Sequence, residues 1–273
     1  MKKMLLLIIA IPLLIFSGCT KDSTKSQPFQ LEKFYNGFAQ SNLLSSFSSD
    51  FNPYYSVVEY NNGKVSKVIH ENSVFLPIGT GAFEIKSLDS YHHYSYNGNM
   101  VEIIWEIDSD EIIFTPVKTQ LTLDNDGRII KRLDCNTKDT TYYFYSKNGN
   151  IEKSITTTLY NNRITRNFFF DGNNNLVHIS GLQVTNRGFR SHIFEYFRKF
   201  DTGLNGFKNF GIIEGAFIRS LSKNNYNEYA RAIYNEDNLI IDSLWIRMPV
   251  TYNGEGHPIY SEIKPMAATL VPL

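Results

Sequence analysis

A short polar turn sequence recurs along most of this chain and constrains its fold more than any other feature. Each copy starts with an aromatic or aliphatic residue, passes through Asn, Asp or Gly, and in most copies ends with a β-branched or aliphatic residue. Asn-Gly and Asp-Gly reach positive φ at little steric cost, which suits tight turns between antiparallel strands. We therefore expect a hairpin at each copy. The clearest copies are residues 60–65, 96–101, 123–129 and 145–151, and looser ones are 160–164, 170–176, 234–239 and 252–256.

The segments between these turns have the composition of strands. Residues 102–107, 153–159 and 165–170 are rich in Ile, Thr, Phe and Trp, which pack well on a pleated surface. Polar and apolar residues alternate, so one face of the sheet should be solvated and the other covered. The sequence predicts a mainly β fold, an antiparallel meander of repeated hairpins that forms a large twisted or curved sheet, with one or two short helices packed on it.

Two segments have apolar residues at helical spacing. The first predicts a helix over residues 211–221 that covers the sheet, and the second predicts a short helix that begins near residue 31. Their apolar residues are Ile212, Ile213, Ala216, Phe217 and Leu221 in the first, and Leu31, Phe34, Tyr35 and Phe38 in the second.

The amino terminus has the pattern of an export signal that ends in a modified cysteine. Lys2 and Lys3 precede an apolar stretch over residues 4–16, which is shorter than the ~20 residues that span a bilayer. The sequence Phe-Ser-Gly-Cys that ends at Cys19 resembles the bacterial lipobox, although Leu is more common where Phe16 stands. The resemblance implies lipid attachment at Cys19, and the alternative is a plain signal peptide that happens to end in cysteine.

The same pattern sets the expected domain organisation. Residues 1–18 should be a signal peptide, residues 19–28 a lipidated flexible tether rich in Ser, Thr and Lys, and residues 29–273 a single β-rich domain. Thr20 follows the cysteine, and by the resemblance to sorted lipoproteins this favours anchoring in the outer membrane rather than the inner one. The periplasmic and cell-surface faces both stay open.

Composition excludes several functions. The chain has 27 basic and 27 acidic residues, so it lacks the cationic excess of a nucleic-acid-binding protein. With Cys19 assigned to lipid, Cys135 has no partner for an intramolecular disulfide. Cys135 alternates with Ile129 and Leu133 on one face of an expected strand, which favours a buried, inert thiol over a catalytic one.

The turn repeats together with a late segment resemble the YD-repeat-like lipoproteins of Bacteroidota, whose hairpin repeats are similar to RHS repeats. The late segment comprises residues 196–201, 205–210 and 221–225, and Gly206 stands where the family has proline. The resemblance implies an exported β-rich lipoprotein of unassigned activity. It carries no catalytic residues over to this chain.

No group of residues predicts a catalytic, metal or cofactor site. Adjacent His92 and His93 should point to opposite faces of a strand and so cannot easily share a metal ion. The other histidines, His70, His178, His192 and His257, lack the spacing of a metal site. The carboxylates of residues 108–111 and 124–127 have the composition of turns and do not fit a calcium loop.

Function is therefore predicted only in outline. The chain has 20 Phe, 17 Tyr and 2 Trp, and residues 142–145 and 168–170 place rings on both faces of a strand. One ring set is either a binding surface for a glycan or protein or a set of cross-strand pairs. We expect an envelope-tethered lipoprotein with a binding or scaffolding role, and the alternative is a hydrolase acting on envelope glycans or peptides.

Overall fold

The computed structural model describes residues 33–35, 55–78, 82–107, 115–203, 205–213, 216–247, 250–252, 258–261 and 264–265. Backbone contacts divide the chain into residues 1–30 and 31–273, and all described residues lie in the second unit. The predicted signal peptide, Cys19 and the tether therefore lie outside the described residues. So do the carboxylates of residues 108–111, His257 and most of the turn at 252–256.

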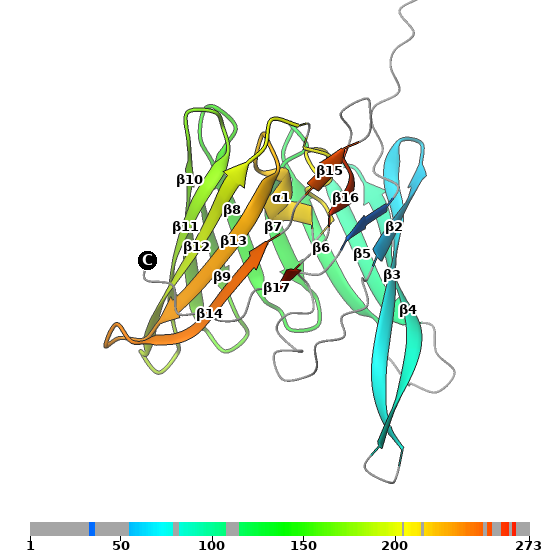
Figure 1. Ribbon diagram of the computed structural model, residues 1–273, viewed down its shortest axis with the longest axis horizontal. Helices are drawn as coiled ribbons and strands as arrows, with labels where there is room; N and C mark the ends of the chain where they lie inside the picture. Colours follow the sequence, from blue (N-terminus) through cyan, green and yellow to red (C-terminus); the bar gives the residue numbers. More distant parts are fainter. Residues whose placement is uncertain are drawn as a thin grey trace, which may run out of the picture. The chain divides into compact units, whose positions relative to one another are not determined.

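The described part of the chain is almost entirely β-structure (Figure 1). The first nine strands are β1 (Lys33–Tyr35), β2 (Tyr55–Asn61), β3 (Lys64–Ile78), β4 (Ala82–Asn97), β5 (Met100–Ile107), β6 (Val117–Leu123), β7 (Ile129–Asp134), β8 (Thr140–Tyr145) and β9 (Ile151–Thr157). The remaining elements are β10 (Arg163–Phe170), β11 (Leu176–Val184), β12 (Arg190–Phe200), α1 (Phe217–Ser220), β13 (Tyr226–Tyr234), β14 (Ile240–Arg247), β15 (Val250–Tyr252), β16 (Pro258–Ser261) and β17 (Lys264–Pro265).

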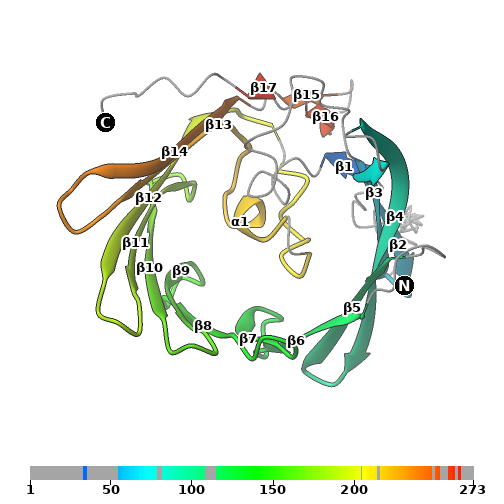
Figure 2. The same cartoon turned by 90° about the horizontal axis from the view of Figure 1, so that it is seen from below.

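One 15-stranded sheet contains β1 to β14 in chain order, with β17 added beside β14. Every neighbouring pair runs antiparallel, so the predicted antiparallel meander is confirmed. Strands β15 and β16 form a separate two-stranded sheet. Figure 2 shows the large sheet curving around α1, which lies on its concave side. Within the described ranges, no helix has the length and apolar character needed to cross a lipid bilayer.

Six of the described hairpin loops share one backbone geometry. In each, the N–H of the first residue donates to the carbonyl of the fifth at 2.8–3.0 Å, and the N–H of the fourth donates to the carbonyl of the first at 2.9–3.1 Å. The fourth residue always has positive φ, as in Gly127 (φ 76°) and Asn174 (φ 63°), which explains why only Gly or Asn stands there. The loops are residues 124–128, 146–150, 158–162, 171–175, 185–189 and 235–239.

These loops confirm the hairpin prediction for the described copies of the repeat. The copy at 60–65 turns through Asn62 (φ 51°) and Gly63 (φ 74°), and the copy at 96–101 turns at Gly98 (φ 60°). Asp124 acts as predicted for turn chemistry, because its Oδ1 accepts the N–H groups of Asp126 at 3.0 Å and Arg128 at 2.9 Å. The loop at 185–189 has the same geometry, although the sequence reasoning did not single it out.

The concave face of the sheet carries the core. Two clusters of buried side chains lie on it, the first along β2 to β7 and the second along β9 to β14. Phe217 and Tyr143 pack against both clusters, with their ring centroids 5.2 Å apart. The first cluster includes Val58, Val68, Val101 and Leu121, and the second includes Ile151, Leu176, Ile179 and Phe197.

The segment that covers this core is less helical than predicted. Residues 206–212 form successive turns and only Phe217–Ser220 form a helix, so the predicted helix over 211–221 is confirmed only at its end. Phe207, Phe210 and Ile213 nevertheless point into the first cluster, as the apolar pattern requires. The helix predicted from residue 31 is wrong where the structure describes it, because Lys33–Tyr35 pair with β2 as strand β1. The edge of the sheet offered these residues hydrogen-bond partners that outweigh their weak helical spacing.

The late segment on which the family resemblance rests holds this cover in place. Asn205 donates from Nδ2 to the carbonyls of Arg219 at 2.8 Å and Ser222 at 2.7 Å, and its Oδ1 accepts the N–H of Phe207 at 3.0 Å. Ser222 Oγ in turn accepts the N–H of Leu176 at 3.0 Å. The conformation of the segment is thus fixed by side-chain hydrogen bonds to backbone groups, which a helical pattern alone does not reveal.

Candidate functional site

A cavity of about 420 Å³ lies between the concave face of β4 to β8 and the covering segment. Its apolar wall comes from alternate residues of the strands, because residues paired across neighbouring strands share a face. Tyr94, Ile103 and Thr119 form one such row, and Leu121 and Arg132 belong to the next row of the sheet. Phe217, Ile212 and Ile218 close the cavity from the side of the segment.

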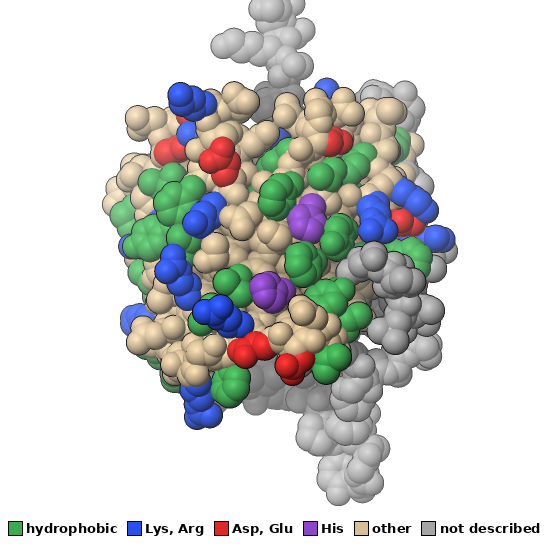
Figure 3. All heavy atoms as spheres, turned by 90° about the vertical axis from the view of Figure 1, so that its left-hand side faces the viewer, with side chains coloured by type: hydrophobic (Ala, Val, Ile, Leu, Met, Phe, Trp, Pro, Cys, Tyr) green, Lys and Arg blue, Asp and Glu red, His purple; other side chains and the backbone are tan. Residues whose placement is uncertain are grey.

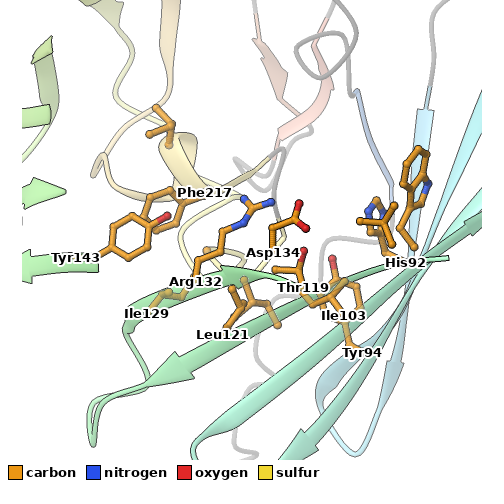
Figure 4. A pocket seen from close by; sticks show the side chains of 15 residues that line it. His92, Tyr94, Ile103, Thr119, Leu121, Ile129, Arg132, Asp134, Tyr143 and Phe217 are labelled. Carbon is orange, nitrogen blue, oxygen red and sulfur yellow. The ribbon is translucent and has the colours of Figure 1, made fainter. Parts of the chain in front are cut away.

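Arg132 and Asp134 are charged residues that line this cavity, and they extend toward one another in Figure 4. Asp134 Oδ1 accepts the N–H groups of Asn136 at 2.8 Å and Thr137 at 2.9 Å, so the turn after β7 holds the carboxylate in position. Guanidinium groups only donate hydrogen bonds and carboxylates only accept them. The pair therefore offers both functions side by side in an otherwise largely apolar space.

His92 lines the cavity together with Trp105, whose ring stacks on it at a centroid distance of 6.1 Å. Nδ1 of His92 lies 2.7 Å from Nε2 of His70, and Nδ1 of His70 lies 2.6 Å from Oγ of Ser56. Burial lowers the pKa of His92 to about 4, with further contributions from Arg132 and His93. His92 is thus neutral at pH 7, and its hydrogen-bond chain leads away from the cavity into the core.

The histidine predictions are partly confirmed. His92 and His93 do point to opposite faces, since His93 contacts Glu106 at 2.8 Å on the outer face while His92 faces the cavity. His70, which the sequence did not connect with any other histidine, is hydrogen-bonded to His92 of the neighbouring strand. The two histidines meet because of the register between β3 and β4. Val68 pairs with His92, so that His70, two residues further along β3, lies diagonally beside His92.

Sequence reasoning missed Arg132 and Asp134 because a β-bulge changes the face of each residue. Two residues of β7, Ile129 and Ile130, stand against Leu123, so alternation restarts after the bulge. Ile129 is buried inside, whereas Leu133 pairs with Gln120 on the other face. The prediction that Cys135 shares a face with both is therefore wrong. Cys135 lies half-buried in the turn that follows β7.

A second cavity, also about 420 Å³, lies nearer the polar hairpin loops, and Ile212 and Phe217 separate it from the first. Its polar lining is drawn from loop residues such as Arg128, Asn150 and Lys208. Arg128 is already paired with Asp124 at 2.6 Å. In the part of the chain that the structure describes, no three His, Cys, Asp or Glu side chains gather closely enough to hold a metal ion.

The sequence places aromatic rings on both faces of some strands, and the convex face of β10 to β14 carries the set that points away from the core. His178 contacts Phe169 at 5.4 Å and Tyr196 at 4.6 Å between ring centroids, and Phe194 contacts Tyr234 at 5.7 Å. These are the cross-strand pairs expected of a sheet surface. In Figure 3 hydrophobic side chains occupy much of the middle of this side, and most acidic side chains lie toward its upper and lower margins.

Comparison with known proteins identifies no family. No family model matches the sequence, and no curated protein matches it significantly. A porin-like protein from Bacteroides vulgatus ATCC 8482 is among the solved structures that match. It has 10% sequence identity and a TM-score of 0.30, and the alignment covers 80% of this chain and 75% of that chain. At this TM-score the likeness gives no support to any function.

Proposed function

We propose that this protein is an outer-membrane lipoprotein, anchored through Cys19, that binds a neutral sugar unit of a glycan in its concave cavity. The single observation that carries the proposal is the adjacent donor and acceptor, Arg132 and Asp134, in a cavity otherwise lined mainly by apolar and aromatic side chains. A sugar combines an apolar ring face with hydroxyl groups that both donate and accept hydrogen bonds.

Size and charge agree with this ligand class. Small-molecule sites typically enclose roughly 300–1,000 Å³, and they combine an apolar lining with a few fixed polar groups. The cavity falls in that range at about 420 Å³. Arg132 and Asp134 carry opposite charges and His92 is neutral, so a charged ligand would gain little over an uncharged one.

Fluorescence of Trp105 tests the binding proposal directly. In a Trp245→Phe chain, Trp105 is the sole tryptophan and lies at the cavity. Titration with maltotriose, cellotriose and N-acetylchitotriose should change its emission with at least one of them. Thr119→Phe should block binding by filling the cavity, and Arg132→Gln should weaken it by about tenfold, equivalent to ~1.4 kcal/mol.

Lys131→Gln is the matched control, because Lys131 is the neighbouring cation on β7 and contacts Tyr142 rather than the cavity. It should bind as the parent chain does. Emission that never changes, or a change that survives Thr119→Phe, would contradict a sugar site in this cavity. The anchor is tested separately by metabolic labelling with an alkyne fatty acid, which Cys19→Ser should abolish.

The hydrolase alternative draws on the chain Ser56–His70–His92, which ends at the cavity. Ser56 is fully buried, with 0% of its surface exposed, so a substrate does not reach its hydroxyl. The hydrolytic version of the proposal would instead use His92 as a base toward water. Chromatography of the same oligosaccharides after prolonged incubation distinguishes the two functions. Shorter products that form with the parent chain, and do not form with His92→Gln, would support hydrolysis instead of binding alone.

A further inference from the structure

The two ends of the large sheet differ sharply in composition although their loops share one geometry. Consecutive hairpins place alternate loops at opposite ends (Figure 1). At one end, the second and third loop residues are all polar or Gly: Asn125, Asp126, Lys147, Asn148, Gly172 and Asn173. The other end carries exposed apolar residues, which we call the apolar rim: Leu159 (56% exposed), Tyr160 (70%), Phe189 (63%), Leu239 (62%), Ile240 (41%) and Ile241 (60%).

Turn formation does not require these apolar side chains. The shared loop geometry fixes the fourth residue through its positive φ, and polar first residues supply the supporting hydrogen bonds. Leu159 and Tyr160 occupy the second and third positions, where the polar end has Lys147 and Asn148. Exposed large apolar side chains that are concentrated in one place mark a site of interaction.

The rim is held as one unit by hydrogen bonds between neighbouring loops. Asp139 Oδ1 accepts the N–H of Leu159 at 2.9 Å, and Asn162 Oδ1 accepts the N–H of Asn186 at 2.9 Å. Glu236 accepts the N–H of Arg190 in the next pair of loops. The apolar tips are thus fixed relative to one another and form a row along three neighbouring loops at this end of the sheet.

We propose that the apolar rim inserts into the surface of a phospholipid bilayer. A row of projecting tips needs no shape-complementary pocket in its partner, and a fluid lipid layer provides none. Tyr160 suits the interface because its ring is apolar and its hydroxyl is polar. Charges beside the rim nearly balance, with Lys138, Arg163, Arg187 and Arg190 against Asp139, Glu236 and Asp237. This balance favours uncharged lipid headgroups over a strongly charged macromolecule.

This inference concerns a different part of the molecule from the cavity and does not rest on sugar binding. Its test compares two tryptophans at equivalent loop positions, each introduced into a full-length Trp105→Phe, Trp245→Phe chain. Tyr160→Trp reports on the apolar rim, and Asn148→Trp reports on the third position of a loop at the polar end. Both chains carry the same amino terminus, so any acyl anchor contributes equally to both.

The probe is phosphatidylcholine vesicles whose acyl chains carry bromine, which quenches tryptophan only at short range. Quenching of the tryptophan at position 160 should exceed that at position 148 at least twofold, and the serine double substitution Leu159→Ser, Phe189→Ser should remove the difference. Circular dichroism should show the same β-structure in all variants. Equal quenching at the two positions, or none at either, would overturn the proposal, and the second result would favour a protein partner for the rim.

Discussion

Single residues at the cavity determine how its interior responds to pH. His92 is neutral in the folded chain because desolvation, assisted by Arg132 and His93, disfavours its charged form. Its Nδ1 is also engaged by His70, which hydrogen-bonds to Ser56. Adding a proton to His92 therefore places a positive charge at the end of this buried chain of hydrogen bonds.

Stability should consequently fall in mild acid. The pKa of His92 is about 4 when folded, against 6.5 without the protein environment. Between these values the unfolded chain binds more protons, so the free energy of unfolding is greatest above pH 6.5 and decreases toward pH 4, by about 3 kcal/mol. Urea unfolding at several pH values measures this slope, and His92→Gln should flatten it. His192→Gln, at an exposed histidine, should leave the slope unchanged. An equal slope in His92→Gln would show that another group is responsible.

At the scale of elements, the covering segment between β12 and β13 determines whether a cavity exists. It supplies Ile212, Phe217 and Ile218 to the cavity wall. The helix within it is only Phe217–Ser220, too short to be stable through its own hydrogen bonds. Its position depends on apolar packing and on the amide of Asn205, which bridges the two ends of the segment.

Asn205→Ala should therefore lower the free energy of unfolding by about 2–3 kcal/mol, because three hydrogen bonds between its side chain and buried backbone groups are lost. Denaturant unfolding measures the change. Asn209→Ala is the matched control, since Asn209 is exposed in the same segment, and its effect should stay within about 0.5 kcal/mol. Similar losses in the two variants would mean that the amide of Asn205 does not anchor the segment.

At the scale of the whole sheet, cooperativity requires explanation. In a meander each strand contacts mainly its two neighbours, so distant strands have little direct means of folding together. The two core clusters on the concave face meet at Tyr143 and Phe217. The covering segment thus links the two halves of the sheet as well as closing the cavity.

Removing that link should separate the unfolding of the two halves. The fluorescence of Trp105 on β5 reports on the half of the sheet that carries the first cluster, and that of Trp245 on β14 reports on the half with the second. Each signal is measured in a chain in which the other tryptophan is replaced by Phe. The parent chains should unfold at coincident denaturant concentrations. Phe217→Ala should destabilise by about 3 kcal/mol and split the two transitions. Phe169→Ala, on the exposed convex face, should keep them together. Coincident transitions in Phe217→Ala would show that neighbour-to-neighbour pairing suffices for cooperativity.

The meander could be predicted from the sequence because its information is local. A positive φ at Gly127 or Gly149 is a property of one residue and its neighbours, and each such turn commits the flanking segments to pair antiparallel. The presence of an apolar cover near Phe217 was likewise readable, since its spacing places apolar side chains on one side. The extent of the helix was not, because turns stabilised by Asn205 satisfy the same backbone groups.

The candidate site was decided by tertiary structure. Arg132 and Asp134 share the cavity only because the bulge at Ile129 and Ile130 shifts the alternation of β7, and one inserted residue leaves no mark in composition. His70 meets His92 through strand register, which depends on the whole hairpin. The sequence by itself thus determined where the chain reverses, because turns are local, whereas only the assembled sheet decided which side chains face one another across it.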